Sequence, residues 1–164
     1  MEVFVETSAP ATDYEIERGK PMPSTHHSFV QSNLIGELRN RYRDKFTILP
    51  ELNLDESKGA PSMVPDIAIY PKFKIDVRQP DVIKRKDMPL AVVEILSPRQ
   101  AIEDLIEKAG DFLRAGVQSV WVVVPRMAYI AVYRTPEQFE MFLEPDVLKD
   151  PRLGIELPLE SVFQ

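Results

Sequence analysis

The stretch from Leu90 to Pro125 constrains the fold of this chain more than any other. Residues 90–96 are apolar except for Glu94, a pattern typical of a strand buried on both faces of a sheet. A second apolar run, "SVWVVVP" at 119–125, predicts another buried strand. Burying a carboxylate without a partner costs several kcal/mol or forces it to give up its charge, so Glu94 needs a specific partner.

The segment between these two strands predicts an amphipathic helix. Ser97 is suited to the N-cap, Pro98 to the first helical position and Gly116 to the position after the last turn. One apolar stripe recurs at helical spacing along the segment: Ile102, Leu105, Ile106, Ala109, Phe112 and Leu113. This stripe gives the helix a side that can pack against the sheet.

The rest of the chain adds a second helix and further strands. A helix is predicted from Ser24 or Thr25 to about Arg43, with His27 and Gln31 near the N-terminal end of its apolar face. The other predicted elements are strands at 45–54, 64–70 and 128–135, a charged hairpin region at 72–87, a short hairpin turning at Gly19, and a Pro-punctuated tail at 144–163 that ends in a short helical turn. This order predicts a mixed α/β sandwich with the sheet in the middle.

The length of 164 residues is that of one ordinary domain. We expect an N-terminal arm or hairpin at 1–23, a core at 24–135 and a C-terminal extension at 136–164. No apolar run approaches the roughly 20 residues that a membrane span needs. The N-terminus carries acids where a signal peptide would carry Lys or Arg, which favours a cytoplasmic protein.

Composition narrows the kinds of site that the chain can build. It has no cysteine and only two histidines, which excludes thiolate nucleophiles and disfavours zinc sites made of Cys or His. Any metal would have oxygen ligands, which indicates magnesium, manganese or calcium. The net charge of −6 and the pI near 5.0 argue against a broad basic face for nucleic acid. Small basic clusters at 39–45 and 83–87 have solvated surface as their ordinary explanation.

Two acids occupy strand positions in otherwise apolar runs. Asp66 opens the run in "PDIAIY", and Glu94 interrupts the run in "VVEIL". If these strands are neighbours, their carboxylates can converge on one cation, which neutralises the pair and removes the burial penalty. A phosphodiester hydrolase uses such a metal to polarise the phosphoryl group and to lower the pKa of the attacking water.

Such a hydrolase also needs a cation near the developing charge, and a lysine two positions past the glutamate would lie on the same face of the strand. Here that position is Leu96. The nearest alternative is Lys108, which lies about 100° from the centre of the helical stripe, where a long side chain can reach over the sheet edge. The ordinary explanation of Lys108 is an exposed i,i+4 pair with Asp104.

The other candidate residues also have ordinary structural explanations. Glu94 could be a buried acid satisfied by an arginine, by His27 or by backbone amides. Asp66 could cap a turn or the end of a strand, because it follows a proline. His27 could be a first-turn or core histidine, and Ser97 is explained as an N-cap.

Four stretches of the sequence together resemble a known family. In chain order they are "YEIERGKPMPSTHHSFVQSNLIGEL", "PDIAIY", "VVEILSPRQ" and "DLIEKAGDFLRAGVQSVWVVVP". In order and spacing they resemble the Uma-two family of endonucleases, within the PD-(D/E)XK or restriction-endonuclease-like superfamily. The resemblance covers roughly residues 14–133.

The resemblance implies a restriction-endonuclease-like, three-layer α/β core, with a central mixed β-sheet flanked by helices, and a magnesium-dependent nuclease site in which manganese could substitute. Asp66 matches the Pro-Asp acid of the family and Glu94 its second acid, both metal ligands by analogy, and the carbonyl of Ile95 could add a ligand. Lys108 matches a helix lysine that replaces the strand lysine of the superfamily. His27 matches a histidine that commonly opens the first helix, so we expect it at the edge of the site.

The expected function is hydrolysis of DNA phosphodiester bonds by a metal-dependent endonuclease that acts as a homodimer, with one site for each strand. Two alternatives remain open. One is a non-catalytic binding or assembly module of the same fold, and the other is a hydrolase of small phosphate esters, which the acidic surface suits.

Overall fold

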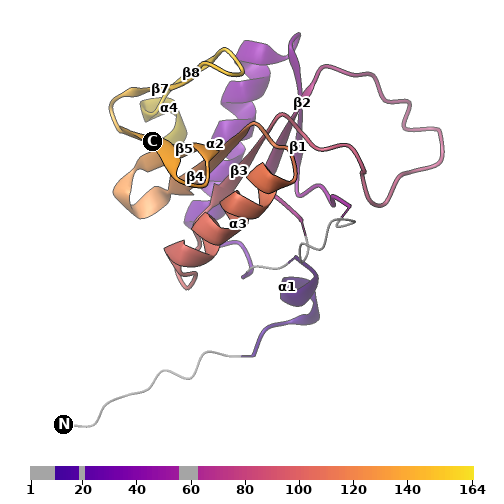
Figure 1. Cartoon of the computed structure of the whole chain (residues 1–164), viewed down its shortest axis with the longest axis horizontal. Helices are drawn as coiled ribbons and strands as arrows, with labels where there is room; N and C mark the ends of the chain where they lie inside the picture. Colours follow the sequence, from indigo (N-terminus) through magenta and orange to yellow (C-terminus); the bar gives the residue numbers. More distant parts are fainter. Residues whose placement is uncertain (1–9, 19–20, 56–62) are drawn as a thin grey trace.

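The computed structural model describes residues 10–18, 21–55 and 63–164. Its centre is a six-stranded sheet in the order β1-β2-β3-β4-β5-β6 (Figure 1). These strands are β1 (Phe46–Pro50), β2 (Ile67–Pro71), β3 (Ala91–Ile95), β4 (Ser119–Val124), β5 (Tyr129–Thr135) and β6 (Gln138–Leu143). β3 and β4 are parallel and the other neighbouring pairs are antiparallel, so the predicted mixed sheet is confirmed.

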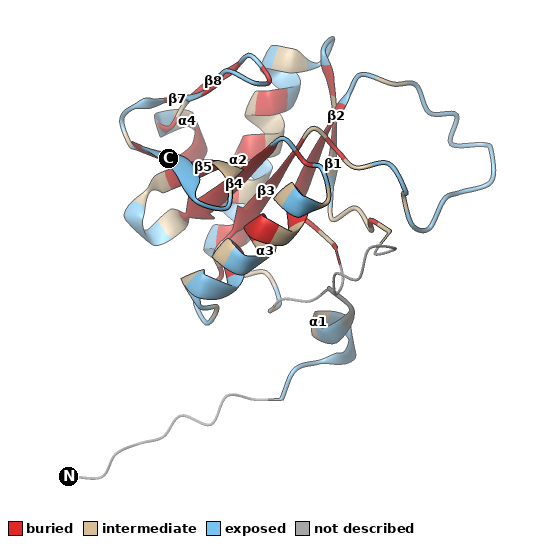
Figure 2. Ribbon diagram, in the orientation of Figure 1, coloured by how far each residue is buried: buried red, intermediate tan, exposed pale blue. Residues whose placement is uncertain are grey.

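Two long helices cover opposite faces of this sheet. The buried side chains of α2 (Thr25–Tyr42) belong to one apolar cluster and those of α3 (Ile102–Arg114) to another. Along β3, Val93 packs in the α2 cluster and Val92 in the α3 cluster, as the alternation of side chains in a strand requires. Figure 2 shows the strands buried between the two helices, which confirms the three-layer arrangement.

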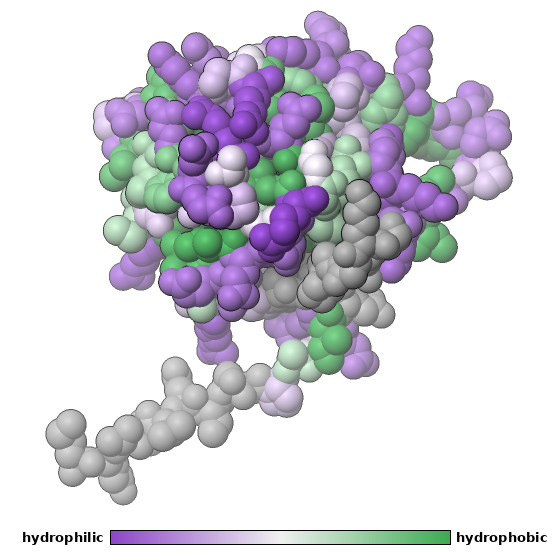
Figure 3. All heavy atoms as spheres, viewed as in Figure 1, coloured by the Kyte–Doolittle hydropathy of each residue, from purple (hydrophilic) through white to green (hydrophobic). Residues whose placement is uncertain are grey.

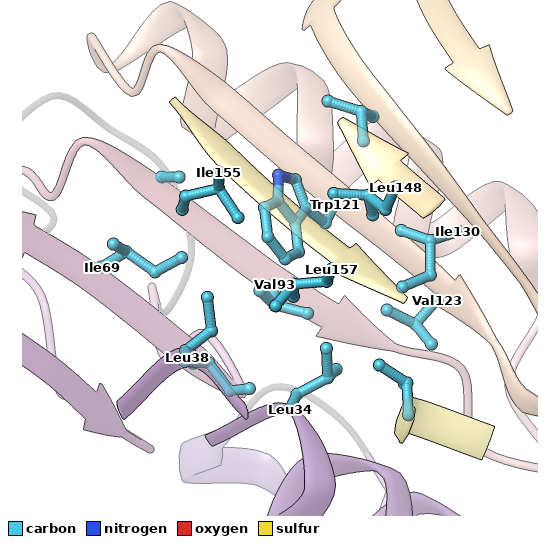
Figure 4. Close-up of a cluster of buried hydrophobic side chains, with 14 of the residues drawn as sticks. Leu34, Leu38, Ile69, Val93, Trp121, Val123, Ile130, Leu148, Ile155 and Leu157 are labelled. Carbon is cyan, nitrogen blue, oxygen red and sulfur yellow. The ribbon is translucent and has the colours of Figure 1, made fainter. Parts of the chain in front are cut away.

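The C-terminal part adds a second, two-stranded sheet on the α2 side. β7 (Val147–Asp150) pairs with β8 (Ile155–Pro158), and α4 (Glu160–Phe163) follows. Leu148 and Leu157 lie in the same buried cluster as Leu34 of α2, with Trp121 among them (Figure 4). The indole Nε1 of Trp121 donates a hydrogen bond to Oδ2 of the buried Asp150 at 2.9 Å, which ties β4 to β7. Of these C-terminal elements the sequence predicts the final helical turn, and it does not predict β6, β7 or β8.

The predicted start of α3 is wrong. The helix begins at Ile102, with Ala101 at its N-cap. Ser97 and Pro98 instead lie in a turn, in which the N–H of Gln100 donates to the carbonyl of Ser97 at 3.0 Å. The chain leaves the sheet through this turn before the helix starts, so the capping preferences of Ser97 and Pro98 serve the turn.

Other predicted helix boundaries are confirmed. The N-cap of α2 is Ser24, whose Oγ accepts a hydrogen bond from the N–H of His27 at 3.2 Å. Gly116 follows the last turn of α3 with a φ of 104°, a conformation that glycine adopts without a steric penalty.

The segment predicted as an N-terminal hairpin contains a helix, α1 (Asp13–Arg18). Thr12 and Glu15 form a capping box, since the N–H of Glu15 donates to Oγ1 of Thr12 (3.2 Å) and the N–H of Thr12 donates to Oε2 of Glu15 (2.8 Å). These bonds favour a helix at this position, and the predicted turn at Gly19 lies outside the described residues.

Residues 72–87 form a long loop that extends away from the sheet, where a hairpin region was predicted (Figure 1). Arg85 anchors this loop, because its guanidinium lies 4.3 Å from the ring centre of Tyr70 and 4.3 Å from that of Phe73. The backbone of Arg85 also bonds to residues 53 and 55, at 2.9 and 2.8 Å. These hydrogen bonds to another segment replace those that a hairpin within the loop would have made.

No helix among the described residues is long and apolar enough to cross a membrane. Hydrophilic side chains predominate on the face of the molecule seen in Figure 3.

Candidate active site

Asp66 and Glu94 lie opposite one another on neighbouring antiparallel strands. The register of β2 with β3 pairs Ile67 with Val93, and one further step in that register brings Asp66 opposite Glu94. Both acids are fully buried. The condition under which the sequence predicts converging carboxylates, that the two strands are neighbours, is therefore met.

The side chain of Asp66 closes the end of the β2–β3 ladder. Its Oδ2 accepts a hydrogen bond from the N–H of Ile95 at 2.7 Å, and its Oδ1 lies 3.1 Å from Nε2 of His27. The hydrogen bond from Ile95 stabilises the charge of the carboxylate, and the contact with the His27 ring helps to fix its orientation.

His27 reaches this carboxylate from the first turn of α2. Its ring is fully buried, and the capping bond to Ser24 fixes the backbone from which the ring extends. The structure therefore places His27 beside one of the two predicted acids. His27 lies on the apolar face of α2, and its ring contacts the buried carboxylate of Asp66.

Lys108 reaches Glu94 from the helix that follows β3. Its Nζ lies 3.3 Å from Oε1 of Glu94 and 3.5 Å from Oε2, and it donates to the carbonyl of Val64 at 3.3 Å. The lysine side chain is only 16% exposed. Lys108 therefore lies against the buried acid, and its ordinary explanation as a solvent-exposed helix pair does not describe it.

Two residues at this site, Gln31 and Glu51, are outside the predicted set. Nε2 of Gln31 donates to the carbonyl of Asp66 at 2.8 Å and to Oε1 of Glu51 at 3.1 Å. Glu51 also donates its N–H to the Asp66 carbonyl at 3.2 Å and has a φ of 50°. The signal for Gln31 is its place one helical turn after His27, whereas Glu51 lies inside a predicted strand and gives no sequence signal.

The donor atoms of this arrangement suit a hard divalent cation. The part of the chain that the structure describes contains no group of three His, Asp or Glu side chains placed to hold a metal ion. Magnesium commonly takes one or two protein carboxylates and completes its coordination with waters and substrate phosphates. Asp66 and Glu94, opposite one another in the strand register, offer two carboxylates that fit that mode of binding.

Comparison with known proteins gives two results. The model of the Uma2 family, described as "Putative restriction endonuclease", matches residues 10–160. The chain is also similar to a crystal structure of a "putative nuclease" from Anabaena variabilis, with a TM-score of 0.73 and 25% sequence identity over 87% of this chain and 83% of that chain. The chain matches none of the curated proteins with which it was compared.

Proposed function

The chain belongs to the Uma2 family, as its sequence resemblance predicts, and from this membership we propose that it is a divalent-metal-dependent endonuclease that hydrolyses DNA phosphodiester bonds. Family membership and the nuclease-like fold support the reaction class. The observation that carries the proposal is the 3.3 Å approach of Lys108 to Glu94, across the strand pair from Asp66.

In this proposal Asp66 and Glu94 hold magnesium, with manganese as the alternative metal. The main-chain carbonyl of Ile95 is the proposed third protein ligand. Support for it comes from the N–H of Ile95, which bonds to Asp66, because the N–H and C=O of one strand residue point to the same side. The bound cation would supply Lewis acidity to the phosphoryl group and would lower the pKa of water at the site.

The proposed role of Lys108 is to orient the attacking water and to stabilise the negative charge that develops on the phosphoryl oxygens. Its contact with Glu94 fixes the ammonium beside the acid without a lysine on the strand itself. His27 is the proposed positioning residue for Asp66, since it touches one carboxylate oxygen and leaves Ile95 to hold the other. Gln31 supports the same acid through the main chain.

A homodimer with one site for each DNA strand remains part of the proposal. Sedimentation velocity of the full chain, with and without duplex DNA, tests this element separately from catalysis.

The central experiment measures metal binding and cleavage on the same set of variants. Calorimetric titration with Mn²⁺ and cleavage of a plasmid in Mg²⁺ are compared for wild type, Asp66→Asn and Glu94→Gln. We expect both variants to lose saturable metal binding and to cleave at least about 10²–10³-fold more slowly, since each loses a charged ligand. Glu107→Gln, the same substitution at an exposed position of α3, is the matched control and should behave as wild type.

Cleavage that survives in Glu94→Gln would contradict the proposed site. A wild-type protein that binds DNA but neither binds metal nor cleaves would indicate the non-catalytic module. Metal-dependent hydrolysis of a small phosphate ester without cleavage of DNA would indicate a hydrolase of small phosphate esters.

A further inference from the structure

A pocket of about 440 Å³ lies at the carboxyl ends of β3 and β4. Its apolar walls are Leu96, Pro98, Val124 and Pro125, and the remaining wall includes the first residues of α2. Because β3 and β4 are parallel, the chain segments that leave both strands reach the same edge of the sheet and enclose the pocket there. Its volume is within the range of about 300–1,000 Å³ that is typical of small-ligand sites.

The pocket adjoins the proposed metal ligands through two of its walls. Leu96 directly follows Ile95, whose N–H bonds to Asp66, and His26 directly precedes His27, whose ring contacts the same carboxylate. The pocket therefore lies close along the chain to the proposed site, while Asp66, Glu94 and Lys108 are not among the residues that line it.

The lining is mostly apolar and carries a cation, the exposed Arg126. The exposed His26 also lines the pocket, and the described residues that line it include no carboxylate. This local character is distinct in a chain with a net charge of −6. Apolar walls suit the flat faces of a nucleobase, and a guanidinium suits the phosphate attached to the same nucleotide.

From these observations we propose that the pocket receives an unstacked nucleotide next to the scissile phosphate, so that the protein prefers single-stranded or unpaired DNA to an uninterrupted duplex. This preference rests on the proposed function, in which the substrate is a DNA phosphodiester, and it specifies that the DNA is single-stranded or unpaired. A base inside a duplex cannot enter such a pocket without leaving its stack, and this step is least costly for an unpaired base. The higher charge density of a duplex also disfavours its binding to an acidic protein.

The test measures binding without metal, so that its outcome does not depend on catalysis. Fluorescence anisotropy in EDTA compares a short single-stranded oligodeoxynucleotide with the blunt duplex of the same sequence. We expect the single strand to bind wild type about tenfold more tightly or better, since a base of the duplex must first leave its stack and its pair. Arg126→Glu and His26→Glu, both at exposed positions, should remove most of this preference.

Lys149→Glu is the matched control, because it changes the net charge by the same amount as Arg126→Glu at an exposed position on β7. It should retain the preference for the single strand. Equal or tighter binding of the duplex, or wild-type behaviour of Arg126→Glu, would overturn the inference even if Mg²⁺-dependent cleavage is found. A preference for the single strand that Arg126→Glu removes, in a protein that never cleaves, would support the pocket and count against the proposed nuclease.

Discussion

Nζ of Lys108, on α3, lies 3.3 Å from Oε1 of Glu94, on β3, so the helix that follows the strand brings a cation to the buried acid. Two residues past Glu94, just after the end of β3, Leu96 packs among apolar side chains on the α3 face of the sheet. The cation beside the glutamate therefore comes from the helix, while position 96 offers an apolar side chain.

Replacing Lys108 with Met should abolish most cleavage while the protein stays folded. Methionine keeps the apolar stem that packs on the sheet, but removes the charge proposed to stabilise the transition state. We expect single-turnover cleavage to slow by about 10²–10³-fold, with a far-UV spectrum like that of wild type. Lys86→Met, at an exposed position in the 72–87 loop, is the control. A Lys108→Met protein that cleaves at the wild-type rate would exclude the proposed role.

Adding Leu96→Lys to the Lys108→Met variant should restore part of the lost activity. Position 96 is two residues past Glu94 and hence on the same face of the extended chain. We expect recovery of about tenfold or more in the single-turnover rate, since a lysine there can again place charge beside the acid. Leu96→Met in the same background is the control and should restore nothing. Equal rates for the two double variants would show that charge at this point of the strand does not serve catalysis.

Replacing His27 should destabilise the fold more than replacing His26. His27 is fully buried with its Nε2 3.1 Å from Oδ1 of Asp66, and its truncation takes this neighbour from a buried carboxylate oxygen, at a cost of about 1–3 kcal/mol. His26 is exposed, and His26→Ala should change the free energy of unfolding by less than about 0.5 kcal/mol. Urea denaturation of His27→Ala and His26→Ala measures both values. Similar small losses in the two variants would mean that the His27–Asp66 contact contributes little to the fold.

Much of the candidate site could be predicted because its acids break strong apolar patterns. Glu94 and Asp66 are visible as carboxylates in buried strands, and Lys108 is placed by the helical wheel of the adjacent stripe. The contacts of Glu51 could not be predicted. They depend on a left-handed backbone conformation after β1 and on Gln31 from a distant helix, and neither is encoded in a periodic pattern.

Elements of the fold that lack a periodic apolar pattern could not be predicted either. β6 leaves five of its six side chains exposed, so it lacks the alternation that identifies a half-buried strand. At the start of α3, the preferences of Ser97 and Pro98 for a helix N-terminus are also those of a turn, and the geometry of departure from β3 decides between them. Local propensity therefore indicates that an element begins or ends at these residues. It does not distinguish a turn after β3 from the first turn of α3.

Acidification should weaken the anchor of the 72–87 loop. Hydrogen bonds of 2.7 and 2.9 Å from Arg85 hold the pKa of the Asp87 carboxyl below its usual range. The stability from this pair is therefore complete above the unfolded pKa of about 3.9 and is lost as the pH falls through the lower folded value. Asp87 is 63% exposed, so the effect should be only a few tenths of a kcal/mol.

The measurement is the difference in free energy of unfolding between wild type and Asp87→Asn as a function of pH. We expect a constant difference above about pH 5 that shrinks below about pH 4, because only the wild type loses a charged partner of Arg85. A difference that grows as the pH falls would contradict the direction of the shift.

The Glu51→Gly variant should be more stable than Glu51→Ala, although alanine is usually the more stabilising of the two residues. Glu51 has a φ of 50°, in the left-handed region that costs a residue with a Cβ about 1–2 kcal/mol and costs glycine almost nothing. Both Glu51→Gly and Glu51→Ala lose the hydrogen bond to Gln31, so that loss cancels in the comparison. We expect Glu51→Gly to exceed Glu51→Ala by about 1 kcal/mol in the free energy of unfolding.

Ser32, at an exposed position in α2, is the control. There the free energy of unfolding of Ser32→Ala should exceed that of Ser32→Gly by about 1 kcal/mol. Urea denaturation of the four variants gives both differences under one condition. An alanine variant at position 51 that is the more stable of its pair would mean that the backbone leaves the left-handed conformation without cost. In that case the contacts of Glu51 with Gln31 and Asp66 would hold no strain at the site.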